Sequence, residues 1–256
     1  MTDRDIIRCV DDGANFYLRF FGEANHMMYF KNDYYSYIQP KKGEHGVKFV
    51  FDVKIESLSQ SERFEIICEL KTLKMPVWWD LQSSDDLYTM IHGKDKGKPV
   101  IEPADGDELY MAILPEDQIN QANRPTTAYA KKVDTPTAFK EWATAVNNIM
   151  FGGYTDIHPV NHYHWCEKGL LNCFTCYVDD IPVSFASIMD NDKICSLEFV
   201  ATDPNHRRQG FARMVCTEAM NYAFNNGAKI ITLRALQPGT RELYTSLGYK
   251  IYNHAL

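Results

Sequence analysis

The sequence lacks the features that would place it in a membrane, in a secretory pathway or on nucleic acid. No run of about 18 apolar residues occurs in it, and charged residues are scattered near its N-terminus, which argues against a membrane span and a signal peptide. Basic residues number 27 against 34 acidic ones, so a formal charge of -7 offers no field to a phosphate backbone. We expect a cytoplasmic protein without nucleic-acid or membrane partners.

A cysteine framework is also absent. The chain has seven cysteines, an odd number, and only Cys173 and Cys176 form a C-x-x-C pair, within a segment typical of a strand. This pattern favours a reducing compartment and free thiols. Cys166 or Cys195 could act as a nucleophile, but this is not indicated, because no neighbour in sequence clearly lowers the pKa of either thiol.

An apolar content of 45% is sufficient for packed cores over 256 residues. Polar, turn-rich sequence occupies residues 93–108, is followed by the strand-like ELYMAIL, and returns in PEDQINQANRPTT. A strand, AYAKKV, and a helix beginning at TPTAFKEW then follow. We place one domain at residues 1–115, a linker at 116–127 and a second domain at 128–256.

The two halves repeat one order of elements. The second half reads strand (SLEFVAT), loop, helix, strand (KIITLRAL), short helix (GTRELYTSLG) and strand (YKIY). The first half reads strand (VKFVFDVKI), helix, strand (PVWWDL) and short helix (SSDDLYTMIHG). Its longer helix has apolar spacing at Phe64, Ile67, Cys68 and Leu70. Both short helices contain Leu-Tyr-Thr. Two related α/β units and chance similarity are about equally good explanations.

The loop HRRQGFA, residues 206–212, stands between a strand and a helix. A helix start presents unpaired backbone N–H groups and partial positive charge, so arginines there are unfavourable unless an anion lies nearby. Gly210 lets an oxyanion approach the backbone, and the small Ala212 allows close helix packing. The spacing fits neither the P-loop nor the dinucleotide G-x-G-x-x-G motif. A pyrophosphate in a different setting is indicated.

VATDPNHRRQGFA resembles the acetyl-CoA signature of the GNAT acetyltransferase superfamily, and KIITLRAL with ELYTSLGYKIY is similar to the family's final strand and helix. The resemblance implies an α/β fold of two GNAT-like domains, each a twisted, mostly antiparallel sheet flanked by helices. It also implies acetyl-CoA as co-substrate, with no metal, and direct N-acetyl transfer to an amine of a small molecule or peptide. The implied coenzyme-binding residues are Val200, Thr202, Arg207, Arg208, Gln209, Gly210, Phe211, Ala212 and Arg213.

Two side chains are candidates for the proton transfers of this reaction. A strand period of two puts Ser196, Glu198, Val200 and Thr202 on one face, where the Glu198 carboxylate could take the amine proton; a solvent-facing strand glutamate is an equal alternative. Tyr244 matches the family's helix tyrosine, whose hydroxyl can return a proton to the coenzyme sulfur. The resemblance further implies that the Val200 backbone N–H meets the oxyanion and that Thr202 contacts the pantetheine amides.

The first half lacks the chemistry of the loop. No glycine occurs between Val47 and His92, and SLSQ precedes its helix, so we predict a degenerate domain that binds no coenzyme, in which Tyr88 is structural. It would pack against the second domain and shape the acceptor site. Since YKIY is not followed by the family's usual further strand, ELYMAIL or another element of the first half could pair with it.

Other readings stay open. His158, His162, His164 and Cys166 could form a zinc site or an acceptor pocket, of which the pocket is the better fit. Trp78 and Trp79 suit core packing, and MMYFKNDYYSYI an aromatic hairpin. The protein could be a monomer or homodimer, could transfer a longer acyl group, or could be a non-catalytic acyl-CoA-binding module whose first domain recognises a partner.

Overall fold

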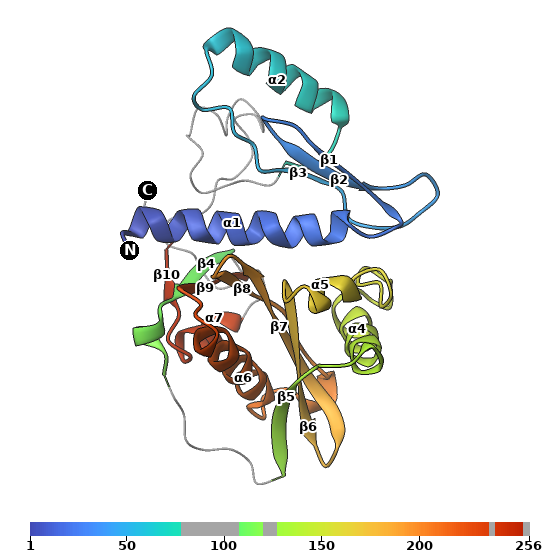
Figure 1. Cartoon of the computed structure of the whole chain (residues 1–256), viewed down its shortest axis with the longest axis vertical. Coiled ribbons are helices and arrows are strands. Elements are labelled where there is room, and N and C mark those ends of the chain that lie inside the picture. The colour runs from blue at the N-terminus through green and yellow to red at the C-terminus, as the bar shows by residue number, and fades with distance from the viewer. Residues whose placement is uncertain (78–107, 120–126, 236–238, 253–256) are drawn as a thin grey trace.

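The computed structural model describes residues 1–77, 108–119, 127–235 and 239–252 (Figure 1). These residues form a mixed α/β structure with two sheets, and the long helix α1 (Asp3–Gly22) lies between them. The three-stranded sheet consists of β1 (Met27–Lys31), β2 (Ser36–Pro40) and β3 (Phe49–Phe51). The predicted α/β class with helix-flanked sheets is confirmed. Among the described residues, no helix is long and apolar enough to cross a bilayer.

The larger sheet has seven strands in the order β10-β4-β9-β8-β7-β6-β5. Its strands are β4 (Leu109–Ile113), β5 (Ala128–Lys132), β6 (Leu171–Val178), β7 (Ile181–Asn191), β8 (Ile194–Thr202), β9 (Ile230–Ala235) and β10 (Lys250–Ile251). All neighbours are antiparallel except β8 and β9. That exception follows from the intervening helix, since parallel strands need a long crossover.

Helices cover both faces of this sheet. Helix α6 (Phe211–Asn225) and the short α7 (Thr240–Thr245) share one apolar core with the sheet, whereas α1, α4 (Pro136–Met150) and α5 (Tyr163–Glu167) share a core on the other face. Helix α4 begins where predicted: Thr135 accepts a hydrogen bond from the Ala138 N–H, and Pro136 occupies the first turn. The site described below lies between these layers.

Strand β4 enters the sheet from the first half of the chain. Its residues pair antiparallel with β9 on one side and with β10 on the other, Met111 facing both Leu233 and Ile251. ELYMAIL therefore supplies the pairing that the C-terminal strand required. The predicted division at residues 116–127 does not separate the sheets, because β4 lies before it and belongs to the larger one.

The Leu-Gly-Tyr motif allows the turn that follows β4 to pack closely against the end of the chain's last helix. Gly248 has a φ of +106°, and a Cβ built there would lie 2.2 Å from the Asp117 carbonyl oxygen. Asp117 ends the 3-10 turn η1 (Pro115–Asp117) that follows β4, and the Ile119 N–H donates to the Leu247 carbonyl. Glycine is thus required both for the conformation and for the close approach.

The three-stranded sheet and helix α2 (Gln60–Leu73) form the remaining layer. The aromatic hairpin is confirmed as β1 and β2. The predicted strand over residues 47–55 is wrong in length: β3 ends at Phe51 because Asp52 turns into the left-handed region, with a φ of +54°. Phe64 and Cys68 were expected on the apolar face of α2, but both are exposed, and only Ile67 and Leu70 are buried. The PVWWDL and SSDDLYTMIHG segments, apart from Pro76 and Val77, lie outside the described residues.

Helix α1 was not predicted. Its start carries a signal in the sequence: Thr2 accepts from the Asp5 N–H while the Asp5 carboxylate accepts from the Thr2 N–H, which is a capping box. Gly13 lets the helix approach the sheet closely, because a Cβ there would lie 2.7 Å from Thr232 Oγ1 and 3.2 Å from Ser196 Cβ. The N-terminal half is thereby packed directly over β8 and β9.

Candidate active site

The predicted loop lines the larger of two adjoining cavities. This cavity has a volume of about 900 Å³, and its wall includes all nine residues expected to bind coenzyme: Val200, Thr202, Arg207, Arg208, Gln209, Gly210, Phe211, Ala212 and Arg213. Residues of the opposite wall come from α7 and from the end of α4. The loop and the two helices therefore enclose a groove at the start of α6.

The start of α6 is built by backbone conformation rather than by a capping side chain. Gly210 is the N-cap residue with a φ of +88°, and no side chain caps the helix. Arg208 also has a positive φ, +61°. Two residues with positive φ so close to a helix start can turn backbone N–H groups toward one concavity, which suits an anion. A Cβ at Gly210 would meet no protein atom within 4 Å, so the space beside it is open to a ligand.

Two arginines are held by the surrounding backbone and helix. Arg207 Nε donates to the Thr202 carbonyl at 3.2 Å, and Arg213 Nη2 donates to Ser246 Oγ, at the end of α7, at 2.7 Å. Phe211 points into the core and is buried, which anchors the first turn of α6. The basic residues thus surround the concavity while the aromatic residue fixes the helix beneath it.

The second cavity lies where β8 and β9 separate. Their parallel pairing ends at Ser196 and Thr232, and beyond it a cavity of about 270 Å³ is lined by Leu197 to Val200 of one strand and by Thr232 to Ala235 of the other. A bulge opens β8 here: three steps from Glu198 to Ala201 oppose two from Ser187 to Phe185. Its residue Phe199 has a φ of +53°.

The bulge corrects the expected alternation along β8. Leu197, Glu198, Phe199 and Val200 all contribute to the wall of the smaller cavity, which a strict period of two forbids. Val200 has no partner in the registers that β8 forms with its described neighbours. The bulge therefore places a backbone N–H outside the regular ladder at the edge of the cavity.

Glu198 and Glu108 both line this cavity, and Glu198 is the one predicted to act as the base. Burial raises its pKa to about 8, against the smaller opposing effects of the Ser196 hydroxyl and the Arg234 guanidinium. The Arg234 side chain, only 9% exposed, pairs with Glu108, with Nε and Oε1 3.2 Å apart. A carboxylate with a pKa near neutrality in a partly enclosed cavity is suited to act as a general base.

Tyr244 and Val200 border both cavities, together with Met150 and Thr240. The Tyr244 side chain is buried, and burial, with smaller contributions from Cys216 and Glu198, raises the pKa of its phenol. It therefore remains protonated at neutral pH. The structure brings the predicted base, the predicted acid and the bulge together around the junction of the cavities.

Several contributors to the smaller cavity were missed from the sequence, among them Tyr17 of α1, Glu108 and Arg234. Arg234 lies within the predicted strand KIITLRAL, but nothing in the local pattern distinguishes it from a solvated strand arginine. Tyr17 follows Val10 and Ala14 at helical spacing, so a capping box followed by this spacing was the available signal.

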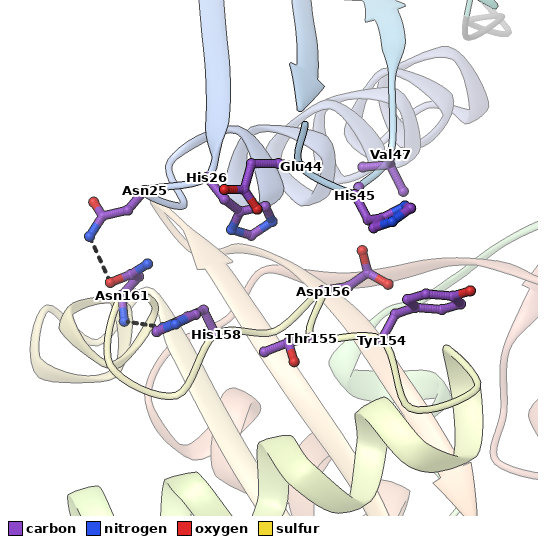
Figure 2. Close-up of a pocket in the computed structure, with 11 residues that line it drawn as sticks. Asn25, His26, Glu44, His45, Val47, Tyr154, Thr155, Asp156, His158 and Asn161 are labelled. Atoms are coloured by element: carbon purple, nitrogen blue, oxygen red, sulfur yellow. Dashed lines mark hydrogen bonds between the residues drawn. The ribbon is translucent and has the colours of Figure 1, made fainter. Parts of the chain in front are cut away.

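A further cavity of about 860 Å³ lies away from the loop, between the N-terminal half and the segment after α4 (Figure 2). His26 and His45 face Asp156 and His158 across it, and Asn25 Nδ2 donates to Asn161 Oδ1 at one end, 2.8 Å away. Of the predicted histidine cluster, only His158 lines this cavity. In the described part of the chain, no three metal-ligating side chains lie close enough to hold an ion.

The other members of that cluster have structural partners. His162 is fully buried and stacks on Phe20 with ring centroids 4.0 Å apart, and burial lowers its pKa to about 3. His164 lies beside Glu23 of the N-terminal half, Nε2 to Oε2 3.7 Å. Burial raises the pKa of the Cys195 thiol to about 12, so it is not an activated nucleophile.

Comparison with known proteins agrees with this geometry. The family model for the acetyltransferase (GNAT) family matches residues 138–249. A GCN5-related N-acetyltransferase from Kribbella flavida has a TM-score of 0.62 at 16% identity, over 94% of this chain and 91% of that chain. A GCN5-related N-acetyltransferase from Sphaerobacter thermophilus has a TM-score of 0.58 at 12% identity, over 86% and 78%. No curated protein sequence matches significantly.

At these identities the structural likeness establishes the fold, and it extends well beyond the segment that the family model matches. The family match covers β6 to α7, including the bulged strand, the glycine loop and Tyr244. We conclude that residues 138–249 form a GNAT acetyltransferase domain.

Proposed function

We propose that the protein transfers an acetyl group from acetyl-CoA directly to an amine of a small molecule or peptide. The observation that carries the proposal is the junction of the two cavities at Val200 and Tyr244, next to a carboxylate whose pKa burial raises to about 8. Coenzyme and acceptor would approach this junction from opposite sides, so that binding supplies the proximity that the transfer requires.

Coenzyme A would occupy the 900 Å³ cavity. The backbone N–H groups of residues 208–213 would hold its pyrophosphate, because this loop combines the helix N-terminus, the two positive φ values and the open space beside Gly210. Thr202 would contact the pantetheine amides from the end of β8. The reaction needs no metal.

The proposed transfer proceeds in two bond changes. The amine nitrogen attacks the thioester carbonyl carbon while Glu198 takes a proton from the nitrogen, directly or through a water, and the Val200 N–H stabilises the oxyanion. The C–S bond then breaks, the amide remains, and the departing sulfur takes the phenolic proton of Tyr244. Exchange with solvent then removes the proton from Glu198 and returns one to the Tyr244 phenolate.

Glu198 and Tyr244 would act in sequence because their charges are coupled. The negative charge of Glu198 contributes to the raised pKa of the Tyr244 phenol, although burial contributes more. Once Glu198 has accepted the amine proton, that charge is gone, and the phenol becomes a better acid at the step in which the sulfur needs a proton.

The N-terminal half is proposed to be the degenerate domain, residues 1–115, joined through 116–127 to the catalytic domain at 128–256. It supplies structure to the catalytic domain: β4 completes the sheet, and α1 packs over β8 and β9. The chain would function as a monomer or homodimer. The small volume of the second cavity favours a small amine or the end of a peptide.

Thermal unfolding with acetyl-CoA tests coenzyme binding, since a ligand of the folded state raises the midpoint. Release of coenzyme thiol with a panel of primary amines tests transfer. Glu198→Gln and Tyr244→Phe should reduce turnover and leave the coenzyme-induced shift intact. Binding of acetyl-CoA without thiol release from any amine would instead identify a non-catalytic acyl-CoA-binding module, and no shift at all would refute coenzyme binding.

A further inference from the structure

Helix α1 forms one wall of the smaller cavity, although it lies more than 100 residues before the acetyltransferase domain in the sequence. Val10, Ala14 and Tyr17 line the cavity, and their spacing of four and three residues places them on one face of the helix. The other walls are β8, β9 and α7. The cavity is thus incomplete without a part of the N-terminal half.

This wall is fixed in position. Gly13, on the neighbouring part of the same helix, contacts β8 and β9 so closely that a methyl group would lie 2.7 Å from Thr232 Oγ1. Thr232 also lines the cavity. Because the helix cannot withdraw without losing this packing, side chains on its cavity face keep a defined distance from the strands.

Tyr17 is the polar side chain that α1 contributes to this wall. Its ring contacts Phe21 with centroids 5.0 Å apart and Phe199, the bulge residue, with centroids 5.4 Å apart. Burial, followed by the charges of Glu198 and Asp156, raises the pKa of the phenol. It therefore stays protonated, with one hydrogen to donate and an oxygen that can accept.

From this arrangement we infer that Tyr17 is a specificity-determining residue, whose phenolic oxygen accepts a hydrogen bond from the acceptor amine and whose ring limits the acceptor's length. The inference rests on the proposed acetyl transfer and assigns part of the acceptor site to the N-terminal half. An amine that gives one proton to Glu198 has a second N–H, and Tyr17 lines the same cavity as that carboxylate. This bond orients the nitrogen lone pair toward the thioester.

The test uses the full chain with acetyl-CoA and straight-chain primary amines from ethylamine to hexylamine, measuring thiol release. Tyr17→Phe removes the oxygen and keeps the ring, so the KM for the amine should rise about two- to tenfold. The KM for acetyl-CoA and the thermal midpoint should not change. Tyr29→Phe is the matched control, since Tyr29 is on β1 of the same half and lines neither cavity.

A second variant tests the length limit. Tyr17→Ala opens the wall, so the ratio of kcat/KM for hexylamine to that for ethylamine should rise about tenfold or more. Coenzyme binding, measured separately, shows whether the variant is folded. An unchanged amine KM in Tyr17→Phe together with an unchanged length profile in Tyr17→Ala would overturn this inference alone. Absence of transfer by the wild type would overturn the proposed function and the inference with it.

Discussion

Helices α2 and α6 occupy corresponding places in the two halves, but their first turns are constructed differently. Each helix connects two segments that pair in parallel. Val50 of β3, before α2, forms a parallel bridge with Val77 after it, and β8, before α6, pairs in parallel with β9 after it. At α2 the Ser59 side chain accepts from the Glu62 N–H, and Glu62 accepts from the Ser59 N–H. At α6 no side chain caps the helix.

The difference determines which backbone N–H groups remain available to an anion at each helix start. A capping box uses backbone donors that a phosphate would need, and it puts a carboxylate where the anion would lie. At α6 those donors face a cavity beside a glycine and several basic residues. The same element order is thus capped by its own side chains in the N-terminal half and by no side chain in the C-terminal half.

The strongest test of this division compares two glutamates. Glu198→Gln should reduce kcat about 100- to 1000-fold, because the variant cannot take the amine proton. Glu62→Gln should leave kcat unchanged, since glutamine still completes the capping box. Steady-state thiol release measures both, and coenzyme titration confirms that each variant binds acetyl-CoA. Equal activities of Glu198→Gln and the wild type would remove the base from the proposed mechanism.

A smaller effect is expected at Gly210, which has no counterpart in the segment before α2. Gly210→Ala places a Cβ in the cavity and strains a residue with a φ of +88°, at a cost of about 1–2 kcal/mol, so the Kd for coenzyme should rise about 10- to 100-fold. Isothermal titration calorimetry measures the Kd for coenzyme. Gly43→Ala is the control: its φ is +89° and its surroundings are open, but it lies outside the cavity. An equal rise in the Kd for coenzyme in both variants would show that backbone strain alone, and not the Cβ in the cavity, weakens binding.

The contributions of Glu198 and Glu62 to the stability of the fold should depend on pH with opposite signs. Burial raises the pKa of Glu198 to about 8, so kcat/KM should rise about tenfold per pH unit below 8 and level off above it. The stability from this shift is complete below the unfolded pKa, near 4.5, and is lost as pH rises through 8. The hydrogen bonds from Ser59 lower the pKa of Glu62, so its contribution is present above 4.5 and lost in acid.

Thermal midpoints of the wild type and of Glu198→Gln between pH 5 and pH 9 check the first sign. The midpoint of the wild type should fall relative to that of the variant as the pH rises. A constant difference across this interval, or a flat kcat/KM profile below pH 8, would mean that Glu198 is not the buried acid described here.

The sequence predicted the residues of the loop that lines the larger cavity but not several walls of the smaller one, and the reason is the range of the interactions. Arg207, Gly210 and Ala212 act through the backbone conformation of one short segment, so their spacing is informative by itself. Tyr17 and Glu108 reach the cavity only through the packing of distant elements. A strand period of two does not by itself reveal the bulge in β8, because Phe199, and not a glycine, has the positive φ there.

The smallest predicted effect concerns the start of α2, which its own side chains cap. Ser59→Ala removes the side chain that caps α2 and should lower the free energy of unfolding by about 1 kcal/mol, measured by denaturant titration. The Kd for coenzyme should stay unchanged, because α2 lines neither cavity of the active site. A matched alanine substitution at the exposed Ser61, in the same turn, should have a smaller effect. If Ser59→Ala weakened coenzyme binding instead, the N-terminal unit would be energetically coupled to the loop at Gly210, and the separation between a self-capped helix and a ligand-capped one would not hold.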